Sequence, residues 1–157
     1  MAEANEMALA KTVYADLCAA LERREWHYQK HEEDLAVAFG VTGEDIPMEF
    51  VLVVDAGRQL LRVFSKLPFT VPEDKRMELA IATCVASNGI VDGSFDYDIA
   101  EGTIVFRLTA SFRESKIGDG LFDYLIGCSS VAVDAFNDKF LLLCKGLISI
   151  DDFIAKR

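Results

Sequence analysis

The spacing of apolar residues changes along the chain from that of a helix to that of a strand and back, and this limits the fold more than any other feature. One helical face near the start carries Ala10, Val13, Tyr14, Leu17, Cys18 and Leu21. Residues three and four positions apart lie on one side of a helix, so we predict a helix over residues 5–24. After this helix the apolar residues alternate with other residues, with the period of two that is typical of strands. This pattern predicts an antiparallel meander of three strands, at residues 35–41, 48–55 and 59–65.

The second half of the chain repeats this alternation. Thr70 and Glu73 have the spacing of a capping box, and Pro72 suits a first helical turn, so a second helix is expected to begin there. Its apolar face should carry Met77, Ala80, Ile81, Cys84 and Val85. Asn88 and Gly89 tolerate the left-handed conformation of a helix C-cap and should end it.

Three further elements complete the chain. Alternating apolar residues predict a hairpin of two strands, at residues 95–99 and 104–110, around a turn at residues 100–102. A long helix is predicted over residues 119–146, and Ser149 to Asp152 can cap a short last helix.

The order helix, three strands, helix, two strands, helix separates antiparallel strands from helices, which defines an α+β fold. We predict an antiparallel sheet of about five strands covered by helices, within one domain that spans residues 1–157. The predicted core is Val13, Leu17, Leu21, Val37, Phe39, Leu52, Val54, Val63, Ile81, Phe106, Leu108, Leu125, Val133 and Phe136.

The charge of the chain excludes two classes of partner. It has 16 Lys plus Arg against 26 Asp plus Glu, a formal charge of −10, and its basic residues form no patch. Such a surface repels phosphate groups, so we expect neither nucleic acid nor an anionic membrane as a partner. The most apolar stretch, residues 121–150, is interrupted by charges and is predicted to be a core helix rather than a membrane span.

The first residues and the cysteines indicate the cytoplasm. Residues 1–6 are acidic where a secretory signal would be basic. The cysteines at 18, 84, 128 and 144 form no Cys-x-x-Cys motif, and each lies in an apolar, helical setting. We therefore expect buried free thiols in a reducing compartment, with no metal and no cofactor.

Two histidines offer one alternative function. His27 and His31 are four residues apart, a spacing that suits zinc if both lie on one helical turn. Residues 26–33 join a helix to a strand, however, and lack the His-Glu-x-x-His order of zinc proteases. We interpret both side chains as exposed groups in a loop or edge strand, with a metal-binding or enzymatic site at His27 and His31 as the alternative.

Acidic residues offer a second alternative. Four carboxylates lie close together in the sequence, at Asp92, Asp96, Asp98 and Glu101. They lack the order of a calcium loop, because Gly93 comes too early. We predict a solvated strand face, with a ligand or acid/base site at Asp96 and Asp98 as the alternative.

The sequence contains no other recognisable motif of an enzyme. Gly118-Asp119-Gly120 lacks the third glycine of a dinucleotide-binding loop. No motif that carries a catalytic nucleophile occurs, so no catalytic residue is predicted.

Two groups of residues suit contact with another protein. Large apolar or amphipathic side chains stand near the ends of predicted elements, at Trp26, Tyr28, Phe64, Leu67 and Phe69. They can pack helices on the sheet or contact a partner. Small residues form a band on the long helix, at Gly127, Cys128, Ser129, Ser130 and Ala132. Small side chains allow close approach of the sheet or of a second subunit, so a homodimer is a further hypothesis.

Several local sequences carry a resemblance to a known family. The most specific are Asn88-Gly89, Gly93-Ser94-Phe95-Asp96-Tyr97-Asp98 and Glu101-Gly102-Thr103-Ile104-Val105-Phe106-Arg107. With the order of elements, they resemble the YbjN family within the type III secretion chaperone-like fold, over residues 35–155. Residues 26–33 and the apolar long helix depart from that pattern.

The resemblance implies a non-enzymatic, cytoplasmic protein of bacterial origin that binds another protein or a peptide. Its implied role is chaperoning or the regulation of signalling, and its implied oligomeric state is a homodimer. It implies no catalytic residue. The residues agree with it physically, because an acidic surface favours basic or amphipathic partners, and an apolar groove or sheet edge supplies affinity.

Overall fold

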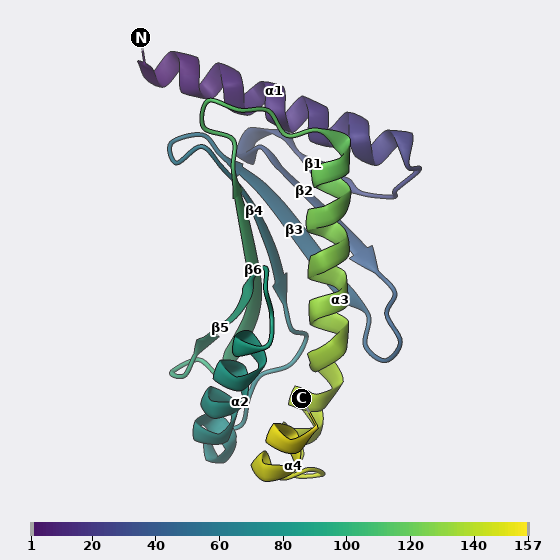
Figure 1. Ribbon diagram of the computed structural model, residues 1–157, viewed down its shortest axis with the longest axis vertical. Helices are drawn as coiled ribbons and strands as arrows, with labels where there is room; N and C mark the ends of the chain where they lie inside the picture. Colours follow the sequence, from purple (N-terminus) through teal and green to yellow (C-terminus); the bar gives the residue numbers. More distant parts are fainter. Residues whose placement is uncertain (1, 157) are drawn as a thin grey trace.

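The computed structural model describes residues 2–156 as four α-helices packed on one antiparallel sheet (Figure 1). The helices are α1 (Ala2–Arg23), α2 (Arg76–Asn88), α3 (Asp119–Cys144) and α4 (Ile150–Ala155). The strands are β1 (Gln29–His31), β2 (Ala36–Val41), β3 (Met48–Asp55), β4 (Leu60–Lys66), β5 (Ser94–Asp98) and β6 (Thr103–Ser111). They lie in the order β1-β2-β3-β4-β6-β5, and each neighbouring pair is antiparallel. The predicted α+β class is confirmed.

The sheet has six strands, where the sequence predicts about five. The additional strand is β1, which pairs Lys30 with Val37 of β2. All three of its residues are exposed, so β1 lacks the alternation of apolar and polar side chains from which a strand is predicted. Its pairing with β2, rather than its own composition, makes it a strand.

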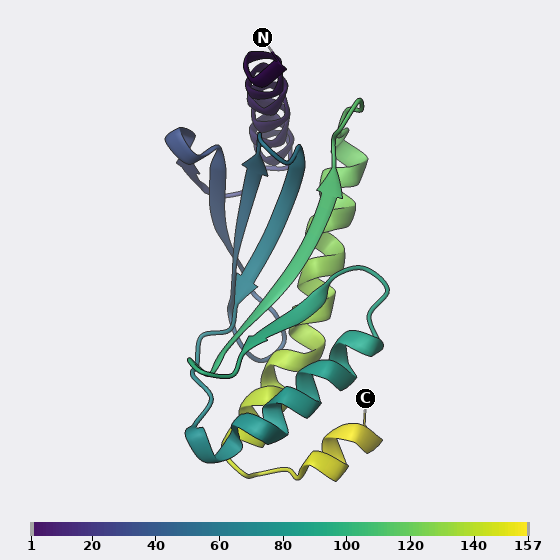
Figure 2. The same ribbon diagram turned by 90° about the vertical axis from the view of Figure 1, so that its left-hand side faces the viewer.

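Helices cover one face of the sheet. α3 runs along that face, α1 crosses one end of the sheet, and α2 and α4 lie at the opposite end (Figure 1). The strand side chains under α3 are fully buried, among them Phe50, Leu52, Leu61, Val63, Ile104 and Phe106. In the view turned by 90°, α3 lies behind the sheet, and none of the helices within residues 2–156 lies in front of β3 and β4 (Figure 2). This uncovered face positions the candidate site described below.

α2 lies beside the edge strand β5 and hydrogen-bonds to its backbone. The Oγ atom of Ser87, in the last turn of α2, accepts a hydrogen bond of 2.9 Å from the backbone N–H of Phe95. Unpaired backbone groups on an edge strand invite pairing with another chain. The serine therefore satisfies one of these groups and holds α2 beside the sheet.

The inner face of α2 differs from the predicted one. Its buried residues are Leu79, Ala82, Thr83 and Ala86. Met77 and Ile81 are 68% and 48% exposed, so Ile81 does not belong to the core. Cys84 is exposed as well, against the expectation of four buried thiols. α2 has apolar residues on two sides. The side with the smaller residues is the buried one, because small side chains allow the helix to approach β5, α3 and α4 more closely.

Helix ends follow the expected signals only in part. α4 begins with a capping box, in which Ser149 Oγ accepts from Asp152 N–H at 3.1 Å and the Asp152 carboxylate accepts from Ser149 N–H at 3.0 Å. Thr70 caps no helix, because a 3-10 turn at Glu73–Lys75 precedes α2. Gly89 ends α2 as expected but with a φ of −86°, so no left-handed conformation is needed there.

The remaining core prediction holds, since all its members apart from Ile81 and the half-buried Phe136 are buried. Cys18 and Cys144 are buried, and burial raises the pKa of the Cys144 thiol to about 11. No helix within residues 2–156 has the length and apolar character needed to cross a membrane.

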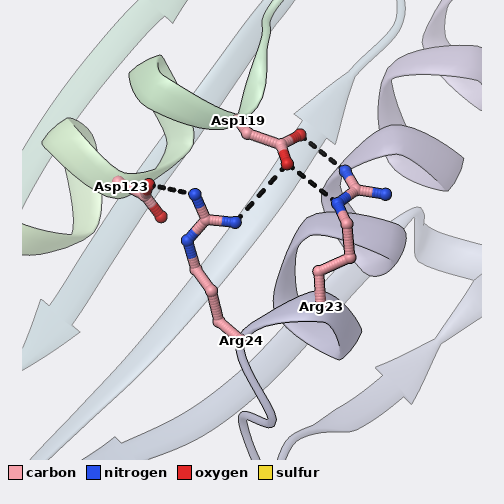
Figure 3. A network of polar contacts seen from close by, with 4 residues as sticks. All are labelled: Arg23, Arg24, Asp119 and Asp123. Atoms are coloured by element: carbon pink, nitrogen blue, oxygen red, sulfur yellow. Dashed lines mark hydrogen bonds and ion pairs between the residues drawn. The ribbon is translucent and has the colours of Figure 1, made fainter.

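An ion-pair network joins the end of α1 to the start of α3 (Figure 3). The guanidinium of Arg23 donates to both carboxylate oxygens of Asp119, at 2.8 and 2.6 Å. Arg24 reaches Asp119 at 3.4 Å and also donates to Asp123. A carboxylate in the first turn of a helix and an arginine in the last turn of another also complement the two helix dipoles.

This network makes a stability contribution that depends on pH. The hydrogen bond from Arg23 lowers the pKa of Asp119 below its usual value. The contribution is therefore fully present above the pKa of about 3.9 in an unfolded chain, and it is lost as the pH falls through the lower folded-state pKa. Asp119→Asn should lower the urea midpoint at pH 7 and leave it nearly unchanged at pH values below both pKa values. The exposed loop substitution Asp45→Asn is the control, and an Asp119→Asn effect of equal size at both pH values would contradict the assignment.

Candidate functional site

The uncovered side of the sheet is the candidate site, and we call it the open face. Its central residues are Ala38, Val51, Val53, Arg62, Phe64 and Arg107. The register places Ala38, Val51, Phe64 and Arg107 side by side in one row across β2, β3, β4 and β6. These residues alternate with the buried ones, so the packing of α3 on the other face directs all of them outward.

The centre of the open face is apolar. Val51 is 39% exposed, while Val53 and Phe64 are half-buried beside their neighbours on adjacent strands. The Arg62 guanidinium lies over the Phe64 ring, 4.8 Å from its centroid. An antiparallel sheet with one face in solvent usually carries polar residues on that face. Valine and phenylalanine at its middle therefore suit a surface that another molecule covers.

Ion pairs flank this apolar centre. Arg107 donates to both carboxylate oxygens of Asp96, at 2.6 and 3.1 Å. On the other side Arg62 lies 3.8 Å from Asp55, whose pKa is lowered mainly by a hydrogen bond from the backbone N–H of Arg58. The two arginines are thus each matched by a carboxylate. The open face offers apolar contact without a large charge of one sign.

One end of the open face leads to an incompletely paired strand edge. β1 pairs only with Ala36 to Ala38, whereas β2 continues to Val41. A hollow of about 390 Å³ lies beside this edge, with His27, Tyr28 and Gln29 on one side and Gly40 and Val51 on the other. Backbone groups of residues 39–41 on this side have no strand partner among residues 2–156.

The structure separates the side chains that the sequence offers for partner binding. Phe64 lies on the open face. Tyr28 borders the hollow, but its hydroxyl is directed to α1, where it donates to Glu22 at 2.9 Å. Trp26 packs edge-on against Phe39, with ring centroids 4.9 Å apart, and is half-buried. Phe69 is half-buried against the core.

Leu67 needs a correction, because it is 2% exposed and lies in the core. Val51 was not among the predicted contact residues. It alternates with Leu52 and Val54, which are predicted core residues, and this alternation is the signal that could have placed Val51 on the outer side of the strand.

The alternative sites from the sequence do not gather into one place. The segment that carries His27 and His31 is an extended strand and its approach, not a helical turn. The Asp98 carboxylate accepts hydrogen bonds from the backbone N–H groups of Ala100 and Glu101, at 3.0 and 3.1 Å, while Asp96 is bound to Arg107. Across the part of the chain that the structure describes, no three His, Cys, Asp or Glu side chains cluster as metal ligands.

No protein-family model matches the chain, and no curated protein matches it.

Proposed function

We propose that this chain is a non-enzymatic protein-binding module that holds an extended segment of a partner polypeptide on the open face of its sheet. The observation that carries the proposal is the row of Ala38, Val51 and Phe64 across a sheet face that no helix covers. Burial of such side chains is favourable in proportion to the apolar area removed from water.

The free edge of β2 determines which kind of partner suits this face. An extended peptide can add a strand to an exposed edge, so that backbone hydrogen bonds give affinity and alternate side chains give specificity. Residues 39–41 offer that edge, and the adjacent hollow of about 390 Å³ can take a partner side chain. A side chain of a peptide that pairs there can enter this hollow and contact Val51, which lines it.

The proposed fold family is the type III secretion chaperone-like fold, and within it the YbjN family. The support is the order α1, β2-β3-β4, α2, β5-β6, α3, which agrees with the order on which the resemblance rests. β1 is an addition to that order. The proposed location is the cytoplasm, in keeping with four free cysteines.

Peptide selection tests the proposal. A display library of random linear peptides, panned on the folded chain, should yield peptides that are extended when bound. Phe64→Asp or Val51→Asp should weaken their binding by roughly tenfold or more, because a carboxylate would then have to be buried against apolar atoms. Met77→Asp, which changes an apolar side chain on α2 that is 68% exposed, is the matched control.

Two readouts decide the result. Amide hydrogen exchange should slow at Gly40 when a selected peptide is bound. Successive residues of β2 direct their backbone groups to opposite sides, so the Gly40 N–H faces the free edge, whereas Phe39 and Val41 already pair with β3. Far-UV circular dichroism establishes that each variant is folded. Peptides that bind both open-face variants as well as the unmodified chain would refute the proposed site.

A further inference from the structure

The free edge of β2 contains a glycine that the packing of the chain does not require. Gly40 follows the buried Phe39 and is exposed, so it lies on the open face of the sheet. It is not among the glycines with a positive φ, and an added Cβ atom would lie 3.8 Å from the Met48 carbonyl oxygen, an ordinary contact. Glycine inside a strand weakens it and often marks a place where a ligand or another backbone comes close. The missing side chain of Gly40 keeps the space over the strand open.

The backbone of Gly40 is also the part of β2 that an added strand would meet. β1 pairs with Ala36 and Ala38 and extends no further than Gln29, so Gly40 is the next residue whose N–H and C=O face that side. Residues directly opposite each other in a ladder point to the same face of the sheet. The side chain of a partner residue that pairs with Gly40 therefore lies on the open face, where it enters the hollow of about 390 Å³.

The far side of this hollow carries an unmatched negative charge. Glu49 of β3 is the register partner of Gly40, lines the hollow and is exposed. None of the ion pairs among residues 4–156 includes Glu49. No lysine or arginine among the described residues lines the hollow, since Lys66 lies in a second hollow on the other side of Glu49. A cation in the first hollow would thus meet a carboxylate without displacing a partner.

The distance across the strands favours a long side chain. Neighbouring strands lie about 4.8 Å apart, so a strand added beside β2 would lie about 10 Å from β3. Lysine and arginine carry their charge at the end of a long apolar stem. Such a stem can lie over Gly40 while its cationic group meets Glu49. An acidic side chain would be repelled there, both by Glu49 and by the formal charge of −10.

We propose that the partner segment bound at the free edge of β2 carries a lysine or arginine opposite Gly40, and that its cationic group pairs with Glu49. This inference rests on the proposed function and assigns the residue type that the hollow selects. Gly40 leaves room for the stem, Val51 contacts its methylene groups, and Glu49 recognises the charge.

Reversing the charge of Glu49 tests this inference. The random peptide library is panned on the unmodified chain and on Glu49→Lys. Peptides selected by the unmodified chain should share lysine or arginine at one position, whereas those selected by Glu49→Lys should share aspartate or glutamate there.

Binding of one selected peptide measures the two positions separately. Glu49→Gln should raise its dissociation constant about two- to fivefold at about 0.15 M salt, the range for an exposed ion pair. Gly40→Val should raise it about tenfold or more, because the valine side chain fills the space of the stem. Valine suits a strand, and circular dichroism establishes that each variant is folded.

Two controls separate this site from the general charge of the chain. Glu101→Gln makes the same change of charge at the exposed β5-β6 turn and should leave the dissociation constant unchanged. The Glu49→Gln effect should vanish for a peptide in which methionine replaces the shared basic residue, because no ion pair then remains to be removed.

The outcomes distinguish this inference from the proposed function. Selected peptides that lose affinity with Val51→Asp but share no basic residue would overturn the inference and leave the open face as the binding site. A basic residue that Glu49→Lys still selects would do the same. If no selected peptide responds to Val51→Asp, the proposed function fails and the inference fails with it.

Discussion

Replacing Phe140 by alanine is expected to lower the free energy of unfolding by about 3–5 kcal/mol, the usual range for a large aromatic side chain removed from a core. Phe140 is fully buried. Its ring centroid lies 5.1 Å from that of Phe95 on β5, 6.0 Å from that of Phe136 on α3 and 5.5 Å from that of Phe153 on α4. Phe136 also lies between these elements, with ring centroids 5.8 Å from Phe95 and 6.2 Å from Phe153. Phe140 is thus one of two rings that join β5, α3 and α4, and the cavity it leaves cannot be closed by moving one of these elements.

Equilibrium urea unfolding, followed by far-UV circular dichroism at one protein concentration, measures this loss. Phe64→Ala is the control, because that ring is half-buried on the open face and contacts the Arg62 guanidinium rather than other rings. The loss for Phe64→Ala should be clearly smaller. Equal losses for the two variants would mean that the aromatic cluster does not hold β5, α3 and α4 together as described.

Gly102→Ala is expected to be destabilising by about 2 kcal/mol or more, through two separate effects. Gly102 has a φ of 71°, a conformation that alanine adopts unfavourably. An added Cβ atom would also lie 2.6 Å from the carbonyl oxygen of Val71. The same glycine accepts a hydrogen bond of 2.8 Å from the Val71 N–H, so the β5-β6 turn cannot move away without losing it.

Gly146→Ala provides a matched control for the turn. Gly146 has a similar φ of 67°, but an added Cβ atom there would meet nothing within 4 Å. Its substitution should lower stability by about 1–2 kcal/mol, the effect of the left-handed conformation alone. The difference between the two variants, measured by urea unfolding, isolates the contact with Val71. If the two substitutions are equally destabilising, the backbone of Val71 does not restrict position 102.

Much of the fold follows from local patterns. β3 and β4 appear close to their predicted bounds because apolar runs with short turns between them leave few other pairings. α3 and the capping box at Ser149 are likewise local features, since a helix face and its cap depend on residues within a turn of each other.

The sequence is less informative where both sides of an element have the same character. α2 has Met77 and Ile81 on one side and Leu79 and Ala82 on the other, so its period agrees with either orientation. β1 consists of exposed polar residues and has no period at all. Contacts with residues distant in the chain therefore determine which side of α2 is buried and that residues 29–31 form a strand.

The candidate site, like the fold, could be predicted from the sequence only in part. The sequence offers Phe64 and Tyr28, together with Trp26, Leu67 and Phe69, as residues that either contact a partner or pack helices on the sheet, because large side chains at element ends are visible in the chain itself. It does not distinguish Leu67, which is buried, from Phe64, which is not. That difference depends on where the helices pack.

By itself, then, the sequence determines the α+β class, the order of the elements and the acidic character of the surface, because helical and strand periods and charge are properties of neighbouring residues. The tertiary structure alone decides which side of α2 is buried and that Leu67, unlike Phe64, lies in the core. Those outcomes depend on the packing of α2 and α3 against strands that are distant in the chain.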